Sequence, residues 1–181
     1  MTTQDPAPTK PNTLAHGVTP LDQVMHLSGL EFMQGILEGR FPPPPIVGVL
    51  KFELVELEHG RAVFAGVPEF AFYNPIGVVH GGYAATLLDS CMGCAVHTTL
   101  DAGQAYTTLE FKINFVRAMT DKTGRVRAEG RMIHPGNRAA TAEGHLYDAQ
   151  GKLLAHATTT CLIFPVGIQP RSGRESGRES G

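Results

Sequence analysis

A single carboxylate stands out in the middle of the chain. Between Glu69 and Asp101, Asp89 is the only residue with an ordinary formal charge at pH 7, and its neighbours are apolar or small. An unpaired buried charge is costly, so a sequence retains one that is partnered, protonated or used in a reaction. Asp89 is therefore either a structural acid bonded to a loop or a general base or nucleophile.

A glycine pair precedes this acid at a loop-to-helix junction. The segment from Asn74 to Gly82 reads Asn-Pro-Ile-Gly-Val-Val-His-Gly-Gly. Glycines at the start of a helix expose backbone N–H groups at the positive end of the helix dipole, where an oxyanion can be held. A lone Gly-Gly is more often only a turn. Here the same segment also offers an amide and an imidazole, and Asp89 follows about two turns into the helix.

At these residues the chain resembles the phenylacetyl-CoA (PaaI-like) thioesterase branch of the hotdog superfamily, and it is similar to one class of 4-hydroxybenzoyl-CoA thioesterases. The matching residues are Asn74, Pro75, Gly77, His80, Gly81 and Gly82, with Asp89 nine residues after the histidine. The likeness extends over about residues 46–164. It implies an acyl-CoA thioesterase with the hotdog fold, a curved antiparallel sheet wrapped around one long central helix.

The resemblance assigns a role to each residue of the motif. Gly81 would donate its backbone N–H to the thioester carbonyl with help from the amide of Asn74, and Gly82 would help to bind the substrate. Asp89 would attack the carbonyl carbon or activate water, and the sequence leaves both routes open. His80 would fix the loop and the substrate carbonyl.

The chain departs from some relatives one turn after the acid. Those relatives carry a hydroxyl residue there, whereas this chain has Gly93. We therefore expect no side chain at that helix position to orient water.

The resemblance also implies a homodimer or homotetramer in which each active site takes its loop from one subunit and its acid from the other. Coenzyme A is part of the substrate, so no separate cofactor and no metal are expected. For its phosphates we predict Asn137 and Arg138, because a glycine turn beside an arginine fork suits a phosphate. Lys112 and Arg117 are further candidates.

Hydrophobic periodicity by itself supports an α+β fold. It predicts a first helix over 20–38 capped by Thr19, an extended proline connection, and a strand from Ile46 that turns at 58–60 into a second strand. A buried helix over about 80–100 and a meander of four more strands follow, the first with Thr107, Leu109 and Phe111 on one face. We expect the first helix, the proline run and Phe70, Phe72 and Tyr73 to line a pocket for an aromatic or medium-chain acyl group.

Composition bounds the partners and the compartment. The 181 residues carry a formal net charge of -2, which excludes a global attraction to nucleic acid or an anionic membrane. Three cysteines in apolar segments, without a secretory signal or a membrane span, favour the cytoplasm. We expect a disordered segment over 1–18, a thioesterase domain over 19–166 and a disordered low-complexity tail over 167–181.

Two other functions remain open. A non-catalytic acyl-CoA binding or sensing module could use the same fold, although no DNA-binding helix-turn-helix is evident. An acyl-CoA hydratase needs a different arrangement of Asp and His. A serine esterase is excluded, because the chain has no Gly-x-Ser-x-Gly elbow beside its His-Gly-Gly segment.

Overall fold

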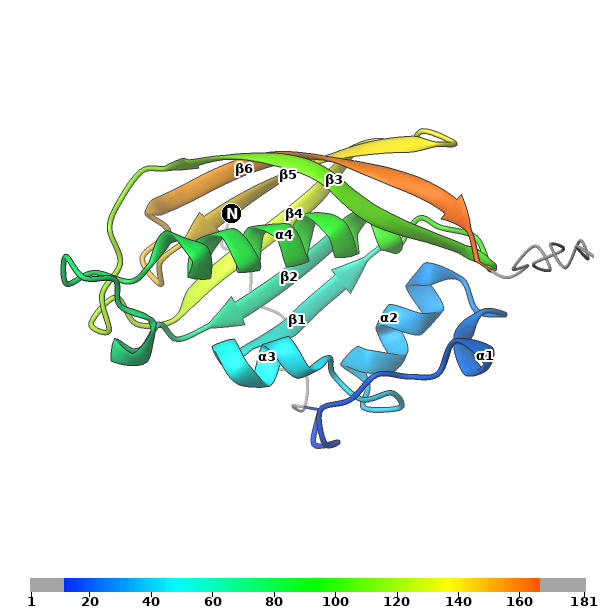
Figure 1. The fold of residues 1–181 in the computed structure, drawn as a ribbon, viewed down its shortest axis with the longest axis horizontal. Coiled ribbons are helices and arrows are strands. Elements are labelled where there is room, and N and C mark those ends of the chain that lie inside the picture. The colour runs from blue at the N-terminus through cyan, green and yellow to red at the C-terminus, as the bar shows by residue number, and fades with distance from the viewer. Residues whose placement is uncertain (1–11, 167–181) are drawn as a thin grey trace, which may run out of the picture.

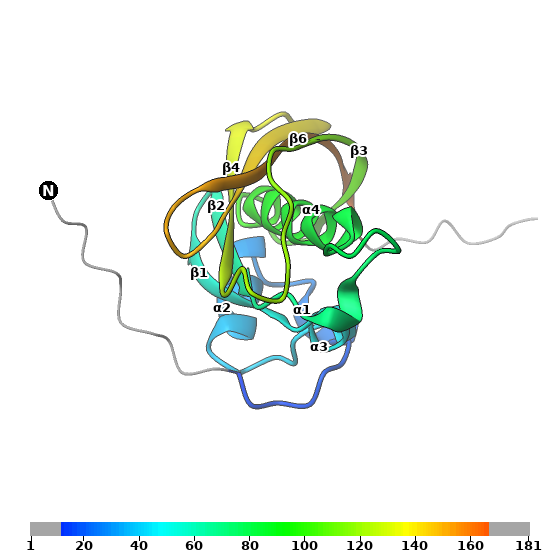
Figure 2. The same cartoon turned by 90° about the vertical axis from the view of Figure 1, so that its left-hand side faces the viewer.

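A curved sheet encloses one long helix in the computed structural model, which describes residues 12–166 (Figure 1). The helix is α4 (Gly81–His97), and the described strands form one antiparallel sheet in the order β1-β2-β4-β5-β6-β3. The strands are β1 (Phe52–Glu58), β2 (Arg61–Gly66), β3 (Gln104–Phe115), β4 (Val126–His134), β5 (Ala139–Tyr147) and β6 (Leu153–Pro165). The end-on view shows the sheet curving around α4 (Figure 2). The predicted α+β architecture, a curved antiparallel sheet around a central helix, is confirmed.

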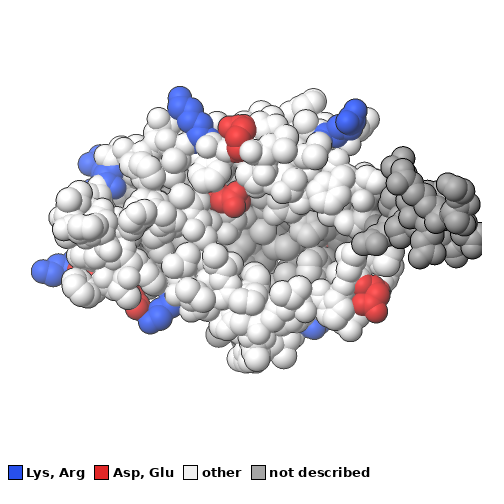
Figure 3. All heavy atoms as spheres, viewed as in Figure 1, with Lys and Arg blue, Asp and Glu red and all other residues white. Residues whose placement is uncertain are grey.

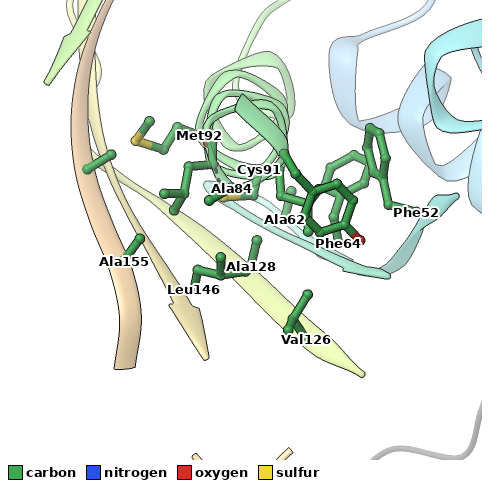
Figure 4. Close-up of a cluster of buried hydrophobic side chains, with 14 of the residues drawn as sticks. Phe52, Ala62, Phe64, Ala84, Cys91, Met92, Val126, Ala128, Leu146 and Ala155 are labelled. Atoms are coloured by element: carbon green, nitrogen blue, oxygen red, sulfur yellow. Dashed lines mark hydrogen bonds between the residues drawn. The ribbon is translucent and has the colours of Figure 1, made fainter. Parts of the chain in front are cut away.

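Small residues allow α4 to lie close against the sheet. A Cβ atom on Gly130 would stand 2.2 Å from the carbonyl oxygen of Cys91, so only glycine permits this approach. On α4, Leu87, Leu88, Cys91 and Met92 are fully buried. Figure 4 shows side chains of α4 pointing toward alanines and larger apolar residues on the inner face of the sheet. This packing fixes the helix along its length, and Asp89 with it.

The strand order differs from a simple meander. β4, β5 and β6 do follow one another, but β3 pairs with β6 at the far edge, from Gln104 opposite Pro165 to Phe115 opposite Ala155. This pairing joins segments about forty residues apart or more, which local periodicity cannot specify. As a result, the other edge of β3 has no strand partner within residues 12–166.

The single helix predicted over 20–38 is wrong. The structure has two helices there, α1 (Leu21–Val24) and α2 (Gly29–Leu37). Ser28 starts the second one through a capping box, because its hydroxyl accepts from the backbone N–H of Glu31 while the Glu31 carboxylate accepts from the N–H of Ser28 at 2.8 Å. The predicted cap at Thr19 is not formed, since α1 has Pro20 as its N-cap with no side-chain hydrogen bond.

The proline run also behaves differently from the prediction. Pro45 begins a short helix, α3 (Pro45–Leu50), so the strand starts at Phe52 and not at Ile46. Proline suits the first helical turn, because it lacks only an N–H that would have no partner there. Lys51 then takes a left-handed conformation with φ 51°, which turns the chain into β1.

Part of the predicted disordered lead-in packs on the domain. Residues 1–11, and the whole predicted tail over 167–181, lie outside the described residues. However, the Asn12 amide donates to the carbonyl oxygens of Ile36 and Phe41, at 2.7 and 2.8 Å. Residues 12–18 therefore belong to the packed structure. The sequence pattern did not reveal this, because the contact depends on the Asn12 side chain reaching carbonyl groups of distant residues.

Ion pairs cover the outer face of β1, β2 and β4. Arg61 is 9% exposed and contacts Glu56 at 2.6 Å and Glu129 at 3.1 Å. Arg127 also pairs with Glu56. These contacts hold the three strands together on the side away from α4. No helix within residues 12–166 is long and apolar enough to cross a membrane.

Candidate active site

Asp89 lies half-buried in the middle of α4 and faces β3. Its Oδ1 accepts a hydrogen bond of 2.9 Å from the hydroxyl of Thr108. Within residues 12–166 it forms no ion pair. Figure 3 shows acidic side chains near the middle of this face, beside a hollow, while the basic ones stand toward its rim. A carboxylate that is held by one neutral donor and paired with no cation can serve as a general base or nucleophile.

Thr108 reaches Asp89 because of a bulge in β3. The pairing of β3 with β6 shifts register between Thr108 and Glu110. Before the bulge, Tyr106 and Thr108 face α4; after it, Phe111 and Ile113 do. The prediction that Thr107, Leu109 and Phe111 share one face is therefore wrong, and Leu109 is 58% exposed. A bulge reverses the alternation, so the sequence pattern did not reveal Tyr106 and Thr108 as neighbours of the acid.

His80 caps the N-terminus of α4. Its Nδ1 accepts from the backbone N–H of Gly82 at 2.8 Å, and its carbonyl oxygen accepts from the N–H of Tyr83 at 3.0 Å. While Nδ1 accepts, a neutral imidazole carries its proton on Nε2. The exposed ring can then donate from Nε2 to a substrate oxygen, but its accepting nitrogen is already occupied. This geometry suits a residue that fixes a carbonyl better than one that removes a proton.

Gly81 presents the free donor of this helix end. Its backbone N–H has no acceptor among residues 12–166, in contrast to the bonded N–H groups of Gly82 and Tyr83. The ring of Phe115 lies over it, so that a Cβ on Gly81 would stand 2.9 Å from the Phe115 Cζ. A free N–H at the positive end of a helix suits a developing oxyanion.

Asn74 lies at the start of the loop that leads into α4. Its Oδ1 accepts from the N–H groups of Ile76 and Val78, at 3.2 and 3.3 Å. The loop closes where Tyr73 bridges Val79 and where the His80 N–H donates to the Phe72 carbonyl at 2.7 Å. The amide oxygen of Asn74 is thus used to shape the loop, and its NH₂ group remains available as a donor.

The two halves of the candidate site lie apart within one chain. Asn74, His80, Gly81 and Gly82 gather at the N-terminus of α4, whereas Asp89 follows Gly81 by eight residues. At 1.5 Å per residue this places their backbones about 12 Å apart along the helix axis. One thioester group cannot touch both, so a single chain does not bring the carboxylate to its own Gly81 N–H.

Asn137 and Arg138 lie elsewhere, at the end of the sheet where β3 begins. With Gln104 and residues 162–165 they line a small cavity of about 340 Å³. Arg138 forms no ion pair within residues 12–166, and neither do Lys112 and Arg117. Arg138 therefore has a free guanidinium group beside a cavity, the arrangement that a phosphate ligand would need.

A larger cavity runs between the N-terminal helices and β1. Its volume is about 2050 Å³, and its lining includes Phe32, Met33, Ile36, Pro42–Pro44, Val47, Phe52 and Cys94. The predicted contributions of the first helical region and the proline run agree with this lining. The aromatic residues after β2 do not contribute, since Phe70 is 75% exposed and Phe72 stacks on Tyr83 at 5.0 Å. Cys94 connects this cavity to the turn of α4 that follows Asp89.

Two other ionisable groups of α4, Cys94 and His97, are held neutral by burial. Burial, followed by the charge of Asp89, raises the pKa of Cys94 to about 12. Burial likewise lowers the pKa of His97 to about 4. At neutral pH neither a thiolate nor an imidazolium forms at these positions.

Comparison with known proteins identifies related sequences. The family model of the thioesterase superfamily matches residues 76–155. The protein named "Putative esterase SSO2140" from Saccharolobus solfataricus is 33% identical over 67% of this chain and 85% of its own length. The 1,4-dihydroxy-2-naphthoyl-CoA hydrolase of Escherichia coli is 29% identical over 50% of this chain and 65% of its own length.

A solved structure supports both the family and the fold. A Ralstonia eutropha protein described as a thioesterase related to phenylacetic acid degradation superposes with a TM-score of 0.66 and 30% identity, covering 72% of this chain and 98% of that one. The sequence likeness and the shared architecture thus point to the same group of proteins. The chain belongs to the thioesterase superfamily, the hotdog-fold thioester hydrolases that its Asn74–Asp89 motif resembles.

Proposed function

We propose that this chain hydrolyses acyl-CoA thioesters to the free acid and coenzyme A, with Asp89 as the catalytic carboxylate. The observation that carries the proposal is the half-buried carboxylate of Asp89, held by the Thr108 hydroxyl at 2.9 Å and paired with no basic residue within 12–166. A structural acid on a helix would normally be paired with a cation or used as a cap. Asp89 does neither.

The reaction follows from the two kinds of group at the site. The Gly81 N–H, helped by the Asn74 amide and His80, polarises the thioester carbonyl and holds the developing oxyanion. Asp89 then attacks the carbonyl carbon directly, giving an anhydride that water hydrolyses, or it takes a proton from the attacking water. In both routes the carbon–sulfur bond breaks. The departing sulfur takes the proton that Asp89 received from water in the general-base route, and takes a proton from solvent in the anhydride route.

The site is completed by a second copy of the chain. Because Gly81 and Asp89 lie about 12 Å apart along one helix, the donor and the acid must come from different subunits to meet at one carbonyl. The free edge of β3 provides a surface for such an association, since an unpaired strand edge of twelve residues readily pairs with another. A homodimer, or a tetramer built from two such dimers, satisfies both requirements.

The substrate is an acyl-CoA with an aromatic or medium-chain acyl group. The apolar lining between α2 and β1 that reaches Cys94 is suited to such a group. Two of the similar proteins are described by aromatic chemistry, a dihydroxynaphthoyl-CoA and phenylacetic acid degradation. Asn137 and Arg138 would bind the phosphates of coenzyme A. We assign the reaction to the domain over 19–166 and to the cytoplasm, where free cysteines such as Cys91, Cys94 and Cys161 stay reduced.

The test is thiol release from a panel of acyl-CoA esters, measured with a thiol reagent. The panel contains phenylacetyl-CoA, 4-hydroxybenzoyl-CoA, hexanoyl-CoA and an enoyl-CoA. We expect catalytic release of coenzyme A from at least one aromatic or medium-chain ester. Saturable binding without release would instead indicate a sensing module, and loss of the enoyl absorbance without thiol release would indicate a hydratase.

A further inference from the structure

Gly93 leaves a notch in α4 that a tyrosine fills. A Cβ atom on Gly93 would stand 2.7 Å from the Tyr106 Oη and 2.9 Å from its Cε2. The phenol hydroxyl therefore occupies the space in which any other residue at position 93 would place its side chain. Tyr106 comes from β3, so the strand supplies a hydroxyl group where the helix has none.

This notch lies on the same face of α4 as Asp89. Residues four apart on a helix are neighbours, with Cβ positions about 5–6 Å apart. Two steps along a strand span about 6.7 Å, close to the rise of about 6 Å over four helical residues. Hence, while Thr108 meets Asp89, Tyr106 meets Gly93. The two hydroxyls stand side by side along the acid-bearing face.

The surroundings keep the Tyr106 hydroxyl neutral. Burial, and then the nearby Cys94, Cys161 and Asp89, raise the pKa of Tyr106 well above its usual value. The oxygen of a neutral phenol has lone pairs that can accept a hydrogen bond.

We propose that Tyr106 positions the water that Asp89 activates, an inference that rests on the proposed hydrolysis and selects its general-base route. An attacking water has two protons, and its lone pair must point at the carbonyl carbon. The water donates one hydrogen bond to Asp89 and the other to the Tyr106 oxygen. Water then adds to the carbon while its first proton passes to Asp89, the carbon–sulfur bond breaks, and that proton returns to the departing sulfur of coenzyme A.

The test compares five variants by steady-state kinetics on the best substrate of the panel. Tyr106→Phe keeps the ring and removes the hydroxyl, and we expect kcat to fall about tenfold, the effect of one lost hydrogen bond, with KM nearly unchanged. Thr107→Val is the control, because it removes a hydroxyl from the exposed face of the same strand, β3, so its kcat should not change. Gly93→Ala pushes the hydroxyl out of the notch and should slow kcat to a similar extent.

Asp89→Asn, alone and combined with Tyr106→Phe, separates the possible failures. If Tyr106 acts on the water that Asp89 activates, the double variant is no slower than Asp89→Asn. A full tenfold further loss in the double variant, or wild-type kcat in both Tyr106→Phe and Gly93→Ala, would overturn the role of Tyr106 while leaving hydrolysis in place. Wild-type turnover by Asp89→Asn would instead contradict the proposed function itself.

Discussion

The hydroxyl of Thr108 donates a 2.9 Å hydrogen bond to the Oδ1 of Asp89, joining strand β3 to the middle of α4. This contact orients the carboxylate through a neutral group, so the acid is fixed in direction while its charge is not compensated. Its second oxygen, Oδ2, has no hydrogen-bond partner within residues 12–166. Oδ1 therefore fixes the orientation of the carboxylate, and Oδ2 remains available for the reaction.

Replacing Thr108 by valine removes this hydrogen bond and preserves the shape of the side chain. A hydrogen bond to a charged group contributes about 1.5–3 kcal/mol, so a carboxylate that loses its orientation should give a kcat lower by about tenfold or more. Thr107→Val is the matched control, because Thr107 is exposed on the opposite face of the same strand. Equal kcat values for the two variants would show that Thr108 does not position the acid.

Adding a methyl group to Gly81 should damage the oxyanion donor. The new Cβ would stand 2.9 Å from the Phe115 Cζ and would crowd the N–H that faces the substrate. We expect Gly81→Ala to lower kcat about a hundredfold, comparable to the loss of one oxyanion-hole donor. Phe115→Ala is the control for displacement of the exposed Phe115 ring. If that displacement caused the loss in Gly81→Ala, removing the ring would lower kcat as much as Gly81→Ala does. We expect Phe115→Ala to lower kcat only slightly.

Mixing two inactive variants tests the composite site. Asp89→Asn subunits retain Gly81, and Gly81→Ala subunits retain Asp89. After subunit exchange, a mixed dimer has one site with both groups intact and one site with neither. About half of the dimers are mixed, and half of the sites in those dimers are intact. Activity should therefore rise well above that of either variant alone and approach one quarter of the wild-type activity. Unchanged inactivity, with exchange verified by tagged subunits, would mean that each site uses one chain.

Acid stability should depend on Glu56. The hydrogen bond from Arg127 is the largest of the contacts that lower the pKa of Glu56 from 4.5 to about 2. The Glu56 carboxylate therefore takes up a proton less readily in the folded state than in the unfolded chain. The stabilising contribution is complete above pH 4.5 and is lost as the pH falls toward 2. In urea unfolding, Glu56→Gln should be less stable at pH 7 and should lose less stability on acidification than wild type.

A surface glutamate provides the comparison for that measurement. Glu53 pairs with Arg125 at 3.0 Å, but both side chains are about half exposed, so water screens the pair. Glu53→Gln should therefore leave the unfolding free energy almost unchanged at both pH values. An equal loss for the two variants would show that the Glu56 network adds nothing beyond an ordinary surface charge.

The sequence predicted best those features that depend on local spacing. The alternation in β4 and β5, the glycine turns and the length of α4 were all readable, because a period of two or 3.6 reports which face is buried. The Asn74–Asp89 motif lies on one continuous segment, so its placement at the start and middle of a helix was also predictable.

The features that the sequence missed depend on contacts between distant segments or on single irregularities. The bulge beside Thr108 reversed the expected face of β3 and hid both Thr108 and Tyr106. A capping box at Ser28 divided the first helical region, and its sequence signature, Ser28 followed by Glu31, was not used in the prediction. The pairing of β3 with β6 had no local signal at all.

The central claim is that Asp89 carries the chemistry of thioester hydrolysis, and the most direct measurement is the rate of coenzyme A release by Asp89→Asn. Asparagine has nearly the same shape and can still accept from Thr108, so the fold should persist, as circular dichroism and thermal unfolding would verify. We predict a kcat at least about a hundredfold below wild type, the loss expected for a general base or nucleophile. A folded Asp89→Asn protein that releases coenzyme A at the wild-type rate would contradict the account.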